Sequence, residues 1–487
     1  MNNKLLQLKP ERLWFYFSEI LEIPRISKKE EKIAEYLMDF GKSHNLETIK
    51  DETGNILIRK PATPGNEKMK SVVLQSHMDM VGEKNGEIDF DFDTDAIQAR
   101  IDGEWVKATQ TTLGADDGIG IAAELAILEA NDIEHGPIEC LFTIDEETGL
   151  TGATGLKPDL LQSKILINLD SEDEGELFIG CAGGRDTNIE FPYSKEASAK
   201  DTSAFIINIS GLNGGHSGDE IQRRHGNSIK LMTRLLWYAS EKFNCRLSKF
   251  DGGNLRNAIP REAYAIITIP DANKNDFIAY FKDYTKKIKN ELKVTEPQLK
   301  IIIETTENPN HLIDIDTQNK LLNSLYACPH GVIEWSADIP NFVETSTNLA
   351  VVKTLDNIID IRTSQRSSVE SAKEDICNMV ASVFKLTAAK IYHSDGYPGW
   401  TPNPDSEIVE ITKESYKKLF NQEPKVLAIH AGLECGLIGH TYPEMDMISF
   451  GPTIKGAHTP EEKLKIDTTT KFWELTIDVL GKIPEDK

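Results

Sequence analysis

The sequence is poor in the features that mark several large classes of protein. Its 6 cysteines are scattered through 487 residues with no C-x-x-C spacing, which argues against a thiolate zinc site or a redox pair. No stretch approaches the roughly 20 apolar residues that cross a bilayer, so no membrane partner is expected. Basic residues are also in deficit, since 78 acidic against 54 basic side chains give a net charge of -24. Such a charge disfavours binding to the phosphate backbone of nucleic acid.

The amino terminus lacks the features of a signal peptide. Its first ten residues contain no sustained apolar segment and no small-residue cleavage site. We therefore expect a soluble, cytoplasmic protein whose cysteines are reduced and mostly buried. The length exceeds what one ordinary hydrophobic core organises, which suggests two or three domains.

The two ends of the chain alternate helical and strand-like segments. Their strands are continuous apolar runs, typical of buried strands in a parallel sheet, and the alternation favours an α/β layer structure. The predicted helices are 10–22, 28–43, 119–130, 405–420 and 467–481, and the predicted strands are 54–59, 71–76, 141–144, 165–169, 425–430 and 445–450.

The middle of the chain follows another order. A strand at 203–212, a helix at 217–243, strands at 245–251 and 261–270, a helix at 274–292 and a strand at 297–304 give the β-α-β-β-α-β order of a ferredoxin-like unit. A second, looser copy follows, with helices at 316–326 and 368–386 and strands at 345–354, 357–364 and 388–393. We therefore expect an α/β domain built from 1–186 and 390–487, with a mostly parallel sheet flanked by helices, interrupted by an α+β lid at 187–389.

Acidic and histidine residues follow the apolar runs. Ligands bind outside the carboxyl ends of parallel strands, so these residues can converge at one edge of the sheet. Their oxygen and imidazole donors, without thiolate, suit zinc, manganese or cobalt. The set looks like a two-metal hydrolytic site and comprises His77-Met78-Asp79, Asp116-Asp117, Asp145-Glu146-Glu147, Asp170 and His458.

Each motif taken alone also has an ordinary interpretation. His77 and Asp79 point to the same side of a strand, so His77 can bind metal while Asp79 orients it, or both can mark an exposed strand end. The pair Asp116-Asp117 precedes a helix and suits either an N-cap or a bridging carboxylate.

The remaining motifs differ in how easily they are explained without a metal. Three consecutive carboxylates at 145–147 would repel one another, so a cation should compensate them. The side chains of successive glutamates point in different directions, so one can bind metal while the other contacts a bound water. Beyond Asp170 the acidic stretch reads as a solvated loop, and His458 alone could be a structural or exposed loop histidine.

Taken in this order, the motifs closely resemble those of the co-catalytic di-zinc peptidases and deacylases, a family that includes carboxypeptidase G, aminoacylase and tripeptide aminopeptidase. The resemblance spans the whole chain and is greatest to the aminoacyl-histidine dipeptidase branch. It implies two divalent metal ions, most simply Zn²⁺, with Co²⁺ or Mn²⁺ as alternatives. It also implies a cis peptide at Asp116-Asp117. Many relatives have lysine at Gly118, and this departure fits the dipeptidase branch.

The resemblance also implies roles for individual residues. His77 would bind one metal and His458 the other, with Asp116 bridging them. Glu147 and Asp170 would each complete one metal's shell. Asp79 would support His77, and Glu146 would be the general base.

Lid residues would bind the substrate. His216 in the segment 214–218 and Asn257 in 256–260 match two family motifs, although a helix-start histidine and a turn asparagine would look the same. Arg362 and Arg366 are candidates for the peptide's carboxylate, with Arg366 preferred by resemblance and a surface arginine as the alternative. The backbone near Gly432 would also help to hold the substrate terminus.

The expected reaction is metal-dependent hydrolysis of dipeptides, favouring an aminoacyl or β-alanyl group joined to histidine. Deacylation of N-acyl amino acids or release of a residue from tripeptides would suit the same site. A catalytically silent binding homologue is the third alternative, and the intact Glu146 argues against it. The partner is then a small peptide, and both a monomer and a homodimer are open, of which we favour the homodimer.

Overall fold

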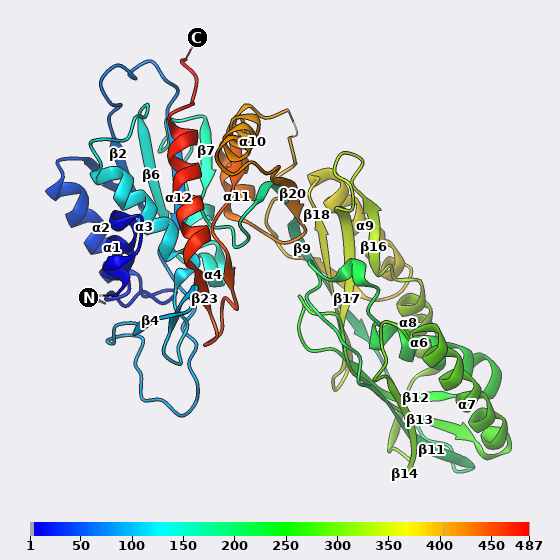
Figure 1. Ribbon diagram of the computed structural model, residues 1–487. Coiled ribbons are helices and arrows are strands. Elements are labelled where there is room, and N and C mark those ends of the chain that lie inside the picture. The colour runs from blue at the N-terminus through cyan, green and yellow to red at the C-terminus, as the bar shows by residue number, and fades with distance from the viewer. Residues whose placement is uncertain (1–3, 404, 487) are drawn as a thin grey trace. The chain divides into compact units, whose positions relative to one another are not determined.

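The computed structural model describes residues 4–403 and 405–486, and its contacts divide the chain into two compact units. Unit 1 comprises residues 1–180, 400–428 and 433–487, and unit 2 comprises residues 181–399 and 429–432. In Figure 1 unit 1 takes both ends of the colour scale and unit 2 takes its middle. We propose that they are the catalytic and lid domains. The expected boundaries, 186/187 and 389/390, lie several residues from these limits, and Gly432 falls in unit 2.

Unit 1 contains an eight-stranded sheet whose four central strands run parallel, whereas the pairs β1–β2, β2–β6 and β8–β21 are antiparallel. The expected α/β class is confirmed, but the sheet is mixed rather than mostly parallel. Its order is β1 (Glu47–Lys50), β2 (Ile56–Lys60), β6 (Ile138–Thr143), β3 (Val72–His77), β7 (Ile165–Asn168), β21 (Asp446–Ser449), β8 (Glu176–Cys181) and β20 (Lys425–Ile429).

The central strands are buried as their continuous apolar runs predict. Every residue of β3, β6 and β7 is buried. Because these three strands are parallel, their carboxyl ends reach the same edge of the sheet. The segments after β3, β6 and β7 carry Asp79, Glu146, Glu147 and Asp170, which places these candidate residues at that edge.

Helices and a small second sheet complete unit 1. The helices are α1 (Glu11–Ile20), α2 (Glu31–Ser43), α3 (Ala115–Glu129), α4 (Glu146–Gly149), α5 (Thr151–Thr154), α10 (Glu407–Phe420), α11 (Glu434–Thr441) and α12 (Ile466–Leu480), and η1 (Leu5–Gln7) is a 3-10 turn. The small sheet has the order β22 (Ile454–Lys455), β23 (Lys463–Lys465), β5 (Trp105–Ala108) and β4 (Ala99–Asp102).

The first half of unit 2 is the predicted ferredoxin-like unit. Its elements are β11 (Thr202–Ser210), α6 (Ser228–Phe243), β12 (Arg246–Gly252), β13 (Ala263–Pro270), α7 (Lys274–Glu291) and β14 (Lys300–Thr306), with the 3-10 turns η2 (Ile221–Arg223) and η3 (Asp271–Asn273). The strands lie in the order β14-β11-β13-β12, which interleaves the two β-α-β halves.

The second half repeats this arrangement, and its first strand comes from far upstream. The expected elements are α8 (Ile315–Ala327), β17 (Val343–Thr354), β18 (Ile358–Ser367), α9 (Glu370–Lys385) and β19 (Lys390–His393). The missing strand is β9 (Gly183–Pro192), which pairs with both β18 and β19. The order β17-β18-β9-β19 mirrors that of the first half. Along the chain, the first half is inserted between β9 and α8.

Pairing of Gly252 with Val352 joins the two halves into one nine-stranded sheet. Along this sheet, β16 (Gly331–Trp335) adds to β17. A separate two-stranded sheet pairs β10 (Lys195–Ala197) with β15 (His311–Ile313). One hydrophobic core cluster includes buried residues of both halves, such as Phe205 and Phe384.

One expected helix in unit 2 begins later than predicted. The helix expected from 217 starts at Ser228, because Asn227 caps it by accepting hydrogen bonds from the backbone N–H of Ile229 (2.9 Å) and Lys230 (3.1 Å). Upstream of the cap, Arg224 has a left-handed backbone with φ 58°. His216 therefore does not lie at the start of α6.

Two expectations from composition can be compared with the described residues. All six cysteines are buried and none forms a disulfide, as expected. Within the described ranges, no helix is both long and apolar enough to cross a membrane.

Candidate metal centre and substrate-binding residues

His77 is the last residue of β3 and is 1% exposed. Its Nδ1 lies 3.3 Å from Asp79 Oδ1. The Asp79 carboxylate also accepts the backbone N–H of Glu146 (3.0 Å) and Glu147 (3.2 Å) and the hydroxyl of Ser27 (2.8 Å). Burial would raise the pKa of Asp79, but His77 and these hydrogen bonds lower it to about 2. Asp79 thus holds the imidazole and the start of α4 together.

Asp116 lies between two histidines. Its Oδ1 is 3.0 Å from His77 Nε2, and its Oδ2 is 3.2 Å from His458 Nε2. The neighbouring Asp117 accepts the backbone N–H of Gly120 (3.2 Å), as a helix-capping carboxylate does. Asp117 therefore fits the N-cap interpretation, and Asp116 has the position expected of a bridging carboxylate. The peptide between them is cis, as the resemblance implied.

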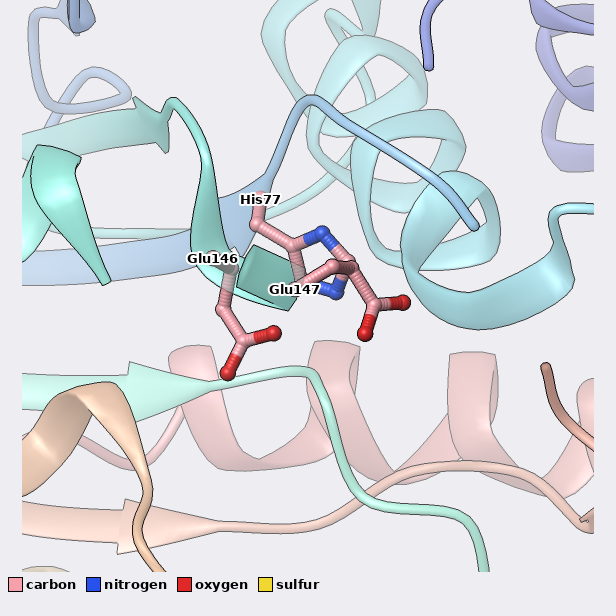
Figure 2. Close-up of side chains that lie close together, drawn as sticks. All are labelled: His77, Glu146 and Glu147. Carbon is pink, nitrogen blue, oxygen red and sulfur yellow. The ribbon is translucent and has the colours of Figure 1, made fainter. Parts of the chain in front are cut away.

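The acidic trio after β6 divides in a similar way. Asp145 has a left-handed backbone, and its carboxylate accepts the hydroxyls of Thr148 and Thr151. In Figure 2 the carboxylates of Glu146 and Glu147 diverge below the ring of His77. Asp145 therefore stabilises the turn, and the two glutamates are left to face the site.

Two groups of possible ligands share one carboxylate. The His77 group consists of His77, Asp116 and Asp170, and the His458 group consists of Asp116, Glu147 and His458. In each group the donor atoms all lie within 4.8 Å of one another. Asp170 Oδ1 is 3.4 Å from His77 Nε2, and Glu147 Oε2 is 2.9 Å from His458 Nε2. Each group therefore offers one imidazole and two carboxylates.

The electrostatics of this cluster suit cations. Burial and the charges of Asp116 and Asp117 raise the pKa of Asp170 well above its ordinary value. Hydrogen bonds to Asp116 and Glu147 raise the pKa of His458 to about 11. Glu147 Oε1 is buried and, within the part of the chain that the structure describes, accepts no hydrogen bond. Paired divalent cations would compensate these carboxylates, so the donor set fits zinc, cobalt or manganese.

Burial also raises the pKa of Glu146 well above its ordinary value. Glu146 lies with His77 and Glu147 in a third group of possible ligand atoms. It contributes to neither the His77 group nor the His458 group. Its carboxylate is thus close to both groups without belonging to them.

In unit 2, Arg366 lies on β18 and is 7% exposed. Its Nη1 donates to the Tyr397 hydroxyl (2.9 Å), and its Nη2 is 3.4 Å from His216 Nε2. Arg362, on the same strand, is exposed and pairs with Asp360 at 3.0 Å. Of the two arginines, Arg366 therefore has the neighbours expected of a buried binding site.

The other lid candidates lie around His216. Its Nδ1 is 3.1 Å from Asp219 Oδ2, and its backbone forms an isolated bridge with Ala258. Next to that bridge, the carbonyl of Asn257 accepts the backbone N–H of Ser217 (2.8 Å). The exposed Asn257 and His216 line the same hollow in unit 2. The fold thus brings His216, Asn257 and Arg366 into one region of unit 2.

Sequence reasoning missed two residues in this region. Tyr397 contacts Arg366, and a Cβ added at Gly432 would lie 2.9 Å from its ring, so glycine leaves room for it. His430 is 6% exposed, its Nε2 is 2.7 Å from Ser346 Oγ, and burial lowers its pKa to about 3. Neither lies in a motif with recognisable spacing. The contact of His430 with Ser346, which pairs with Arg366 across the sheet, is seen only in the structure.

Comparisons with known proteins show the family to which the chain belongs. Residues 73–480 match the model of peptidase family M20/M25/M40. The cytosol non-specific dipeptidase of Escherichia coli K12 is 44% identical over 483 residues, which cover 99% of each chain. The crystal structure of aminoacylhistidine dipeptidase from Vibrio alginolyticus is 44% identical, covers 99% of each chain and has a TM-score of 0.94.

A more distant structure shares the fold alone. Aminopeptidase PepT from Bacillus cereus is 19% identical with a TM-score of 0.63, covering 98% of this chain and 99% of the other. The family model and the long matches at 44% identity cover both units. The chain is therefore a member of peptidase family M20/M25/M40.

Proposed function

We propose that the protein is a metal-dependent dipeptidase with two metal ions bound around Asp116. The observation that carries this proposal is the Asp116 carboxylate, whose two oxygens each face a different histidine. A carboxylate in that position can bridge two cations. The His77 group would hold one ion and the His458 group the other, with zinc as the favoured metal.

Two ions in these groups would polarise the scissile carbonyl and lower the pKa of a bound water. Glu146, which belongs to neither group, would accept the proton from that water and donate it to the leaving amine. Asp79 would keep the His77 ring in place through its Nδ1 side. This division gives each residue of the cluster one task.

Unit 2 would supply the groups that recognise the substrate. Arg366 presents a guanidinium that suits a peptide carboxylate, and Tyr397 fixes one of its two terminal nitrogens. His216 would stabilise the oxyanion that develops at the carbonyl, and Asn257 and the backbone near Gly432 would hold the substrate. Recognition of a free carboxylate one residue beyond the scissile bond would favour dipeptides.

The substrate class follows from the relatives that match the whole chain. One is named a non-specific dipeptidase and the other an aminoacylhistidine dipeptidase. We propose that this protein hydrolyses a range of dipeptides and favours those with a carboxy-terminal histidine, including β-alanyl-histidine. We further propose that it acts in the cytoplasm, as the name of the Escherichia coli relative states of that protein, and that it forms a homodimer.

A substrate panel tests the activity. The purified protein would be assayed on aminoacyl-histidine and β-alanyl-histidine, ordinary dipeptides, tripeptides and N-acetyl amino acids, each with and without a chelator. We expect hydrolysis of the dipeptides, its loss with chelator and its return with added zinc. Preference for N-acetyl amino acids or tripeptides would replace the dipeptidase assignment, and no hydrolysis with metal present would indicate a silent homologue.

A further inference from the structure

Two buried charged side chains hold residues 113–116, which we call the Asp116 loop because the backbone of Asp116 is non-helical although α3 begins at Ala115. The first is Glu462, which is 2% exposed. Its Oε2 accepts the backbone N–H of Leu113 (2.7 Å) and Gly114 (3.0 Å), and its Oε1 accepts those of Ala115 (2.7 Å) and Asp116 (3.4 Å). One carboxylate thus receives four consecutive N–H groups, and such hydrogen bonds to an ionised acceptor are stronger than neutral ones.

The second side chain is Arg25, which is also 2% exposed. Its Nη2 donates to the carbonyl of Gly114 (2.5 Å), and its Nη1 donates to the carbonyls of Met78 (2.9 Å) and Asp79 (2.6 Å). Arg25 therefore ties the Asp116 loop to Met78 and Asp79, which directly follow His77 at the end of β3. The same loop thus donates its N–H groups to Glu462 and accepts a hydrogen bond from Arg25 through the carbonyl of Gly114.

Two glycines, which have no Cβ, lie next to the Arg25 guanidinium. A Cβ added at Gly114 would lie 2.8 Å from Arg25 Nη2, and one added at Gly118 would lie 2.6 Å from the same atom. Gly114 also has a left-handed backbone with φ 69°, which glycine adopts at least cost. A side chain at either position would therefore displace the Arg25 guanidinium from where it lies.

Glu462 also connects two separate parts of the candidate metal centre. It lies four residues after His458 on the loop between β22 and β23, and its own N–H donates to the carbonyl of Thr459 (3.0 Å). Its carboxylate holds the loop of Asp116, whose Oδ2 is 3.2 Å from His458 Nε2. The backbones that carry these two ligands are thus linked through one side chain.

We propose that Glu462 is a positioning residue that fixes His458 relative to Asp116 and so sets the metal affinity of the His458 group. Arg25 holds the opposite side of the same loop. The inference rests on the proposed two-metal function. Neither residue belongs to a ligand group, so both act through the ligands that they position.

The test compares one substitution at two buried glutamates. In wild type each oxygen of Glu462 accepts hydrogen bonds from two backbone N–H groups. In Glu462→Gln an NH₂ group replaces one of these oxygens, so two of the N–H groups lose their acceptor. The matched control is Glu139→Gln, because Glu139 is 4% exposed and accepts the N–H of Gln162 (2.9 Å) and Ser163 (2.8 Å). It belongs to no group of possible ligands among the described residues.

Zinc would be titrated into metal-free samples of the full-length proteins by calorimetry, with thermal melting measured alongside. Loss of support beyond the ligands typically weakens metal binding by roughly 10- to 100-fold. We expect Glu462→Gln to weaken at least the site of the His458 group by that factor, and the second site can weaken too because Asp116 belongs to both groups. Glu139→Gln should lower only the melting temperature.

The inference would be overturned if Glu462→Gln bound zinc at both sites with the affinities of wild type. It would also be overturned if Glu139→Gln weakened zinc binding as much as Glu462→Gln does. If wild type itself binds fewer than two zinc ions, the proposed function fails and the inference fails with it. Should Glu462→Gln not fold, Arg25→Lys provides a second test of the loop's support, because one ammonium nitrogen replaces two guanidinium nitrogens that reach carbonyls on different segments. Unchanged zinc affinities in Arg25→Lys would then refute the positioning role.

Discussion

The two adjacent glutamates after β6 have different surroundings, and we expect different consequences from their loss. Glu147 contacts His458 and belongs to the His458 group, whereas Glu146 contributes to neither group that shares Asp116. Glu146→Ala should keep two metals and lose roughly 10²- to 10⁴-fold in kcat, the usual contribution of a general base. Glu147→Ala should lose one metal as well.

Metal analysis of the two purified variants decides between the roles. Metal loss in Glu146→Ala together with retention in Glu147→Ala would reverse the assignment. The wild-type protein prepared in the same way serves as the control.

Arg366 offers a test of carboxylate recognition. We expect Arg366→Ala to reduce kcat/KM for free dipeptides far more than for the corresponding carboxamides, because only the free carboxylate forms a bidentate ion pair with the guanidinium. Arg362→Ala is the matched control, since Arg362 lies on the same strand but is exposed and paired with Asp360. Equal losses on both kinds of substrate would show that Arg366 does not bind the carboxylate.

His216 should act mainly in the transition state. Removing one donor to an oxyanion typically costs roughly 10²- to 10³-fold in kcat, so His216→Ala should lower kcat while KM and metal content stay close to wild type. The measurement is steady-state kinetics on an aminoacyl-histidine, with metal analysis of the same preparation. A near-normal kcat would leave His216 with a structural role beside Asp219.

At the scale of elements, the start of α6 depends on Asn227, which accepts two backbone N–H groups and donates to the carbonyl of Leu349 (2.8 Å). Asn227→Ala should lower the free energy of unfolding by roughly 1–2 kcal/mol, the usual cost of losing a cap. Asn227→Ser keeps a capping acceptor without placing a charge against the Leu349 carbonyl and should lose less. Denaturant unfolding of both variants measures the difference, and an equal loss would mean that the cap is not the source of the effect.

The elements also show which parts of the fold the sequence predicts. The buried strands β3, β6 and β7 were predictable because each is a continuous apolar run. The strand β9 was not assigned to the second ferredoxin-like unit, because its partners β18 and β19 follow only after the whole inserted first half. The late start of α6 was missed because the segment 217–227 has no strong helix breaker beyond Gly218 and Gly226.

At the candidate site, the residues proposed to carry the chemistry, and Asp79 beside them, could be selected from the sequence, whereas Glu462 and Arg25 could not. His77, Asp116 and His458 stand in motifs whose order along the chain resembles that of the di-zinc peptidases. Glu462 and Arg25 act on backbone groups, and backbone contacts leave no recognisable residue spacing. Their roles can be recognised only when the positions of the backbone N–H and carbonyl groups near Gly114 are known.

For the whole molecule, the division into two units separates the proposed metal chemistry from the proposed substrate recognition. The two ligand groups come from unit 1, and the candidates His216, Asn257, Arg366 and Gly432 come from unit 2. The identity of 44% to two proteins named as dipeptidases extends over both units. In this proposal unit 2 provides the recognition of short peptides and the His216 side chain, and unit 1 provides the metal ligands and the general base.

The central claim is that Asp116 lies between two metal ions. Anomalous diffraction at the zinc absorption edge from crystals of the zinc-loaded protein tests it most directly. The account predicts two peaks, one beside His77 and Asp170 and the other beside Glu147 and His458, with the Asp116 carboxylate between them. A single peak, or two peaks that do not share Asp116, would contradict it.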